Sequence, residues 1–193
     1  MSEIEFELSD DIIKERLRIN DANTINGIYT ICNNLYKEEI ERTKAIEDKS
    51  KSLLSSIGVM LGLLFTVGGF LLEKIKNVSI PVIGSPKIYL SILYLILGFL
   101  LVISGILSFK SLVVRKTWKT ISEKDIFRED VIDKEYTHYA RYMTTHIWKI
   151  YKNNFDVNNN KTKDLFYAQI LFIITLIGFS IMIVIIGAYV YYV

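Results

Sequence analysis

The sequence predicts an all-α integral membrane protein with three transmembrane helices and long cytoplasmic helical extensions that form a bundle. Three stretches without a charged residue support this fold class: residues 52–72, 88–109 and 165–193, which contain 21, 22 and 29 residues. A bilayer core of about 30 Å needs roughly 20 apolar residues in a helix, so each stretch is long enough to cross it. None of them alternates with a period of two, as the strands of a membrane barrel would.

The composition agrees with a membrane protein. Hydrophobic residues make up 51% of the 193, and the mean hydropathy is +0.30, which is high for a chain with 23% charged residues. The net charge of +2 does not favour nucleic acid as a partner. The single cysteine, Cys32, excludes an internal disulfide or a multi-cysteine metal site, and it lies on an apolar stripe where we expect a core residue.

The basic residues predict the topology. Lysines and arginines cluster before the first stretch, after the second and before the third, whereas none follows the third. The positive-inside rule then places the N-terminus in the cytoplasm and the C-terminus outside the cell inner membrane. With no apolar leader before it, the first span is expected to be a retained anchor. The predicted regions are cytoplasmic N-terminal helices at 1–51, a transmembrane hairpin at 52–110 with an outer loop at 73–87, a cytoplasmic helical region at 111–164, and the third transmembrane helix at 165–193.

Helical periodicity places the elements outside the spans. Ser9 is expected to cap a short helix near 9–20. Apolar residues then recur at steps of three and four with no breaker, which predicts one helix from about 23 to 72, roughly 75 Å long. Glu38 with Arg42, and Glu47 with Lys51, are expected to form ion pairs along it.

Beyond the second span we expect the helix to continue to about residue 120, and a further helix to cover 129–153. Residues 155–160 are interpreted as a polar turn or a strained helical joint. Lys161 and Lys163 before the third span echo Lys49 and Lys51 before the first, and all four are expected to reach the inner headgroups. We attribute this echo to interfacial chemistry rather than to an ancestral repeat.

Small residues mark helix-packing faces in two spans. In the first span they follow steps of three and four, and in the second they follow steps of seven. Small side chains let helices approach closely in lipid. One interpretation is packing of the three spans within a subunit, and the other is an interface between subunits that lines a pore. The residues are Ser55, Gly58, Gly62, Thr66 and Gly69 in the first span, and Ser91, Gly98 and Gly105 in the second.

Transport by a carrier and catalysis find little support. No Asp, Glu, Lys, Arg or His lies within a span, which argues against a secondary transporter, although a pore lined by small and apolar residues can gate by dewetting. His138 and His146 are about 12 Å apart on a helix, too far to share one metal. We therefore predict no catalytic residue, no metal site and no cofactor, and a membrane-bound enzyme is the weakest hypothesis.

The expected 129–153 helix mixes aromatic rings with bases. Such a surface can stack bases and neutralise the phosphates of a nucleotide or oligonucleotide. The alternative is an aromatic stripe that packs internally, with bases that face water or anionic headgroups. The residues expected to contact a ligand or partner are Arg141, His146, Lys149 and Lys152.

Residues 38–54 and 158–161 carry a family resemblance. An acidic and basic helix with an Asp-Lys pair and a Leu-Leu step enters the first span, and three asparagines followed by lysine approach the last. This resembles small prokaryotic membrane effectors of the SLATT and Pycsar-type families. The resemblance implies a homo-oligomer, with a tetramer favoured, that opens the membrane in antiviral defence by abortive infection. It also implies a nucleotide or oligonucleotide signal from a partner synthase. The chain departs from the simplest members in its third span and in having no recognisable nucleotide-binding domain.

Two hypotheses follow from the sequence. The first is a homo-oligomeric ion channel or pore in the inner membrane, in contact with membrane lipid and gated through its cytoplasmic helices. The second is a non-conducting anchor or adaptor that recruits a soluble partner through its cytoplasmic stalk.

Overall fold

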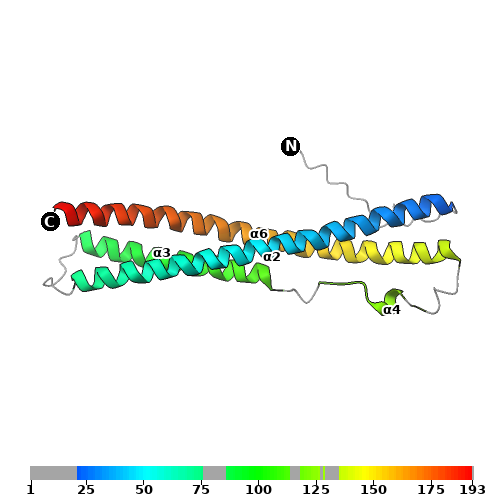
Figure 1. Cartoon of the computed structure of the whole chain (residues 1–193), viewed down its shortest axis with the longest axis horizontal. Helices are drawn as coiled ribbons and strands as arrows, with labels where there is room; N and C mark the ends of the chain where they lie inside the picture. The colour runs from blue at the N-terminus through cyan, green and yellow to red at the C-terminus, as the bar shows by residue number, and fades with distance from the viewer. Residues whose placement is uncertain (1–20, 76–85, 114–117, 127, 129–134, 193) are drawn as a thin grey trace. The chain divides into compact units, whose positions relative to one another are not determined.

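The computed structural model describes residues 21–75, 86–113, 118–126, 128 and 135–192. Within these ranges the chain is all-α, and its helices are α2 (Ala22–Ile75), α3 (Pro86–Leu112), α4 (Glu123–Ile126) and α6 (Tyr136–Tyr192) (Figure 1). Three of them, α2, α3 and α6, are long and apolar enough to cross a membrane, and they pack together. The predicted helix near 9–20 and the central part of the 73–87 loop lie outside the described residues.

Helix α2 confirms the prediction of one uninterrupted helix from about 23 to 72. Its start is capped by Asp21, whose carboxylate accepts hydrogen bonds from the backbone N–H groups of Asn23 and Thr24. Along the helix, buried residues follow one another at steps of three, four or seven, the spacing of a helix that packs along one face. The fully buried members are Ile25, Cys32, Tyr36, Glu39, Ile46, Ser50, Leu53, Ile57, Met60 and Leu64.

The prediction of a polar turn at 155–160 is wrong, because α6 runs through these residues as one α-helix. Asparagine weakens a helix when its side chain bonds to the nearby backbone. Here the buried amides bond elsewhere: Asn154 donates to the backbone carbonyl of Lys119, and Asn158 donates to Glu39 and Thr43. The asparagines therefore join α6 to other segments and leave its own backbone bonds intact.

The predicted extension of the second span to about residue 120 is also wrong, because α3 ends at Leu112 and residues 118–122 are not helical. Asn154 explains the non-helical segment, since its amide both accepts a hydrogen bond from the Lys119 N–H and donates one to the Lys119 carbonyl. The expected 129–153 helix is present from Tyr136 onward, and residues 129–134 lie outside the described residues.

The chain divides into two compact units. Unit 1 contains described residues of Met1–Lys44 and Val114–Asn159, and unit 2 contains those of Ala45–Val113 and Asn160–Val193. The core of unit 1 brings the first part of α2 against the first part of α6, with Ile121 and Ile126 packed on it. Its buried members are Cys32, Tyr36, Met143, Ile147 and Ile150.

Unit 2 is a bundle of three helices around one apolar core. Contacts at its two ends show that α2 and α3 are antiparallel: Ser50 meets Ser111 at one end, and Gly68 meets Tyr94 toward the other. Helix α6 runs parallel to α2 in this unit (Figure 1). The buried core consists of Ile46, Leu53, Ile57, Met60, Leu64, Leu97, Leu101, Leu165, Ala168, Phe179 and Met182.

Candidate functional site

The small residues of the first span lie on the face of α2 that points away from the core of unit 2. Ser55, Gly58, Gly62, Thr66 and Gly69 are all exposed, whereas the buried row of α2 occupies the opposite side. A Cβ atom added at any of the three glycines would meet no atom within 4 Å. Packing within the subunit therefore does not account for these small residues.

The small residues of the second span are placed differently. Ser91, Gly98 and Gly105 of α3 are half-buried. A Cβ added at Gly105 would touch the side chain of Ile57 at 3.8 Å, which is ordinary packing against α2. A Cβ added at Gly98 would meet nothing within 4 Å. Part of this row thus serves packing within the subunit, and part of it is open.

Two glycines that the sequence analysis missed are the ones that close packing inside unit 2 requires. A Cβ added at Gly178 of α6 would lie 2.5 Å from a methyl carbon of Leu97, and one added at Gly68 would collide with the ring of Tyr94. Both contacts are with α3. Because every glycine of a span looks alike in the sequence, only the pairing of the helices separates these two from Gly58 and Gly62.

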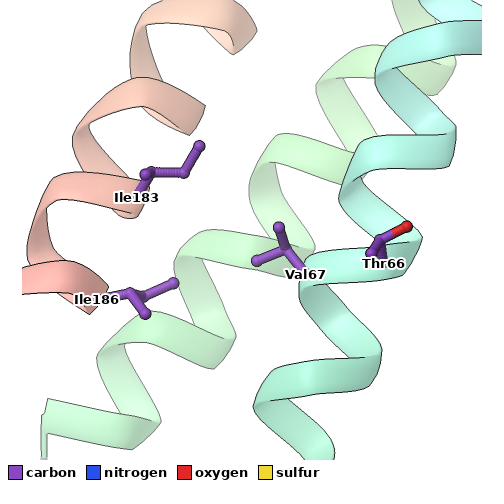
Figure 2. A pocket seen from close by; sticks show the side chains of 4 residues that line it. All are labelled: Thr66, Val67, Ile183 and Ile186. Carbon is purple, nitrogen blue, oxygen red and sulfur yellow. The ribbon is translucent and has the colours of Figure 1, made fainter. Parts of the chain in front are cut away.

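A crevice of about 310 Å³ opens between α2 and α6 in unit 2 (Figure 2). Val67 points from α2 toward α6, and Ile183 and Ile186 line the other side. Thr66 is the polar member of the lining residues that the structure describes, and its hydroxyl donates to the Gly62 carbonyl of its own helix. The described lining of the crevice therefore offers apolar contact to a lipid chain or another helix.

Serines form a buried polar cluster in unit 2 that the sequence analysis did not single out. The hydroxyl of Ser50 shares a hydrogen bond with that of Ser111, and Ser108 donates to the Ser50 carbonyl. Ser104 donates to the Ala168 carbonyl of α6, so the serines link all three helices. The spacing of α2 gave a signal, because Ser50 falls in the same row as Ile46 and Leu53.

Ion pairs lie near these serines. The Lys161 ammonium donates to the Glu47 carboxylate at 3.3 Å, and Lys110 donates to Asp164 at 3.0 Å. Lys161 is only 1% exposed, so the expectation that it reaches the headgroups is wrong. The nearby Glu47 carboxylate offers its ammonium a partner inside the bundle, which removes the need to extend toward solvent.

The residues expected to contact a ligand lie in unit 1 on α6. Arg141 and His146 are half-buried, and Lys149 and Lys152 are exposed. The His146 ring stacks on Tyr142 with a centroid distance of 6.0 Å, and the Arg128 guanidinium lies 5.6 Å from the centre of the same ring. The Tyr142 ring thus has both an imidazole and a guanidinium beside it within the chain.

A second aromatic and basic group in unit 1 involves Arg42. Its guanidinium donates to Asn159 at 2.7 Å and lies 5.3 Å from the centre of the Phe155 ring. Tyr151 stands between Phe155 and Trp148 in a ladder of tilted rings, and burial raises the pKa of its hydroxyl. Arg42 thus connects α2 to α6 in this unit, and the three rings form a ladder along α6.

The remaining candidates for chemistry are Cys32 and the two histidines. Cys32 is buried, and its burial raises the pKa of the thiol, which disfavours the reactive thiolate. His138 and His146 join no group of three metal-ligating side chains in the part of the chain that the structure describes.

Comparisons of the chain with models of protein families, with curated proteins and with solved structures found no match.

Proposed function

We propose that the protein is a multi-pass protein of the cell inner membrane that assembles with copies of itself, with a tetramer favoured, into an ion channel or pore. The observation that carries this proposal is the exposed small-residue face of α2, at which Gly58, Gly62 and Gly69 have open space beside them. In lipid, helices associate where small residues allow close approach and where hydroxyls can bond across the contact. A second copy of the chain supplies such a helix.

The same face supports a conducting assembly. Ser55 and Thr66 bring hydroxyls to an otherwise apolar surface, and both are exposed. A ring of copies that turned these residues inward would enclose a path lined by hydroxyls, glycines and apolar groups. Such a path conducts when hydrated and closes by dewetting.

In this proposal unit 1 is cytoplasmic and controls the pore. The signal is a nucleotide or oligonucleotide from a partner synthase, and the setting is antiphage defence by abortive infection, as the SLATT-like resemblance suggests. Exposed Lys149 and Lys152, next to half-buried Arg141 and His146, provide positive charge for phosphates. Aromatic rings beside them provide stacking partners.

A second candidate function is a non-conducting anchor that recruits a soluble partner. It is favoured by large apolar side chains that unit 1 leaves exposed, among them Ile31 and Tyr136. Exposed apolar groups outside a bilayer are typical of protein interaction surfaces.

Replacing Gly58 and Gly62 with leucine tests the proposal. We expect Gly58→Leu/Gly62→Leu to abolish cross-linked oligomers, ion flux in liposomes and toxicity, because the side chains would hold neighbouring helices apart. Gly187→Leu is the matched control, since Gly187 also has no atom within 4 Å of an added Cβ but lies on α6.

The alternative outcomes are distinct. The channel proposal fails if the purified protein conducts nothing under any nucleotide signal and its expression leaves the membrane potential intact. An adaptor would keep partner binding in the double variant. Equal loss of assembly in Gly187→Leu would remove the assignment of the interface to α2.

A further inference from the structure

Lysines from all three long helices meet at one level of unit 2. The contacts define this level: Glu47 of α2 pairs with Lys161 of α6, and Lys110 of α3 pairs with Asp164 of α6. Ser50 of α2 also bonds Ser111 of α3 there. Residues 47–51, 108–111 and 161–164 therefore lie side by side, and they include Lys49, Lys51, Lys110, Lys161 and Lys163.

The acids at this level are already engaged by lysines. Glu47 pairs with Lys161, Asp164 with Lys110, and Asp48 with Lys51 at 3.6 Å. These pairs leave out Lys49 and Lys163, which are both exposed. The level consequently presents uncompensated positive charge on α2 and on α6.

On α6 this charge continues directly into an apolar strip. Lys163, Tyr167, Ile170 and Ile174 follow one another at steps of four, three and four, which places them on one face of the helix. All four are exposed, and Phe166 packs edge-on against Tyr167 with a centroid distance of 5.9 Å. The face thus offers an ammonium, then a phenol, then branched aliphatic side chains.

We infer that this level of unit 2 is a binding surface for anionic phospholipids, with its best-defined site on the Lys163–Tyr167 face of α6. The headgroup phosphate pairs with the Lys163 ammonium and accepts a hydrogen bond from the Tyr167 hydroxyl, and an acyl chain lies along Ile170 and Ile174. Lys49 holds a second headgroup at the same level on α2. This inference rests on the insertion of unit 2 in a membrane, as proposed above.

The order of groups along α6 favours a lipid over a soluble anion. A free phosphate or nucleotide would use the ammonium and the phenol but not the aliphatic residues, whereas a phospholipid also covers the exposed Ile170 and Ile174 that follow them. Basic residues at a membrane surface each contribute about 1 kcal/mol to the attraction of anionic lipid, which corresponds to about fivefold in binding.

The test measures which lipid the full-length protein retains. The protein is reconstituted in vesicles with equal amounts of phosphatidylglycerol and phosphatidylcholine, extracted in mild detergent, and its bound lipid is quantified by mass spectrometry. We expect enrichment of phosphatidylglycerol, and a fall of that enrichment by about fivefold or more in Lys49→Gln/Lys163→Gln. Lys163→Arg should retain it. Lys37→Gln/Lys124→Gln is the control, because it removes two exposed lysines of unit 1.

Several results would overturn the inference. These are retained lipid that matches the vesicle composition, equal loss in the control variant, or release of phosphatidylglycerol by millimolar inorganic phosphate, which would indicate a general anion site. Failure of the channel proposal is distinguished from failure of the lipid proposal by measuring ion flux and membrane insertion as well as bound lipid. A protein that stays in the vesicles after an alkaline wash and enriches phosphatidylglycerol, but conducts nothing, would support the lipid surface and reject the pore.

Discussion

Lys161 carries a charge into the interior of unit 2, where it is 1% exposed and bonded to a Glu47 carboxylate that is 27% exposed. The sequence instead suggested that Glu47 pairs with Lys51 along α2. In the structure Lys51 pairs with Asp48, and Arg42 pairs with Glu39 rather than Glu38. An ion pair along one helix contributes only a few tenths of a kcal/mol. The buried Lys161 ammonium of α6 therefore decides which lysine pairs with Glu47.

Removal of the carboxylate should therefore be costly. We expect Glu47→Gln to lower the free energy of unfolding by about 3 kcal/mol, because it leaves the Lys161 ammonium buried without its anion. Thermal unfolding of the full-length protein in detergent measures this, and Glu47→Gln/Lys161→Met should recover most of the loss. Asp48→Asn is the control: it breaks an exposed pair and should cost under about 1 kcal/mol. Equal effects of the two single variants would contradict the prediction.

Asp21 gives the start of α2 a dependence on pH. Hydrogen bonds from the Thr24 side chain and then from the Thr24 and Asn23 backbones hold the pKa of its carboxyl below the ordinary value. A lowered pKa in the folded state means that the cap is fully effective above the unfolded pKa of aspartate and is lost as pH falls through the folded value.

We accordingly expect the Thr24 amide to become less protected from hydrogen exchange as pH falls below about 4. The comparison is with Asp21→Asn, whose side-chain carbonyl accepts the same bonds at every pH. After correction for intrinsic exchange rates, an identical pH profile in the variant would show that the carboxylate does not cap the helix.

At the scale of the element, α2 follows from the sequence almost completely. Its buried row keeps steps of three, four or seven from Ile25 to Leu64, and its continuity through the charged segment before the first span was predicted from the absence of a breaker. The asparagine-rich segment of α6 was not predictable in the same way. Whether Asn154 and Asn158 interrupt a helix depends on partners elsewhere in the chain, which local spacing does not specify.

The packing role of each glycine in unit 2 also depends on partners elsewhere in the chain, and this leads to a prediction. Gly178→Ala should destabilise the protein by about 1–3 kcal/mol, because its methyl group would overlap the buried Leu97 side chain. Gly187→Ala, on the same helix but without a neighbour, should change stability by less than about 1 kcal/mol. Thermal unfolding distinguishes the two. Leu97→Val should relieve Gly178→Ala in part, and the absence of any difference between the two alanine variants would refute the packing.

On the scale of the whole molecule, three helices that could each cross a membrane predict that residue 193 and the segment between the second and third spans, which contains Lys119, lie on opposite sides. We expect a membrane-impermeant maleimide to label Val193→Cys in intact cells and Lys119→Cys only after permeabilisation. Cys32→Ala serves as the background for both. Labelling of both positions from the same side would reject the topology on which the channel and adaptor hypotheses are built.

The sequence by itself determined three charge-free helices of sufficient length and the long periodic helix that leads into the first of them. These features depend only on residue spacing and on the thickness of a bilayer. The tertiary structure decided which face of each helix is covered. In the folded protein Ser50 and Lys161 are buried, Gly178 lies close to Leu97, and Gly58 and Gly62 have open space beside them. The physical reason is that the spacing of residues along the sequence defines which side chains share a face of a helix. Which of these faces is buried depends on where the neighbouring helices pack.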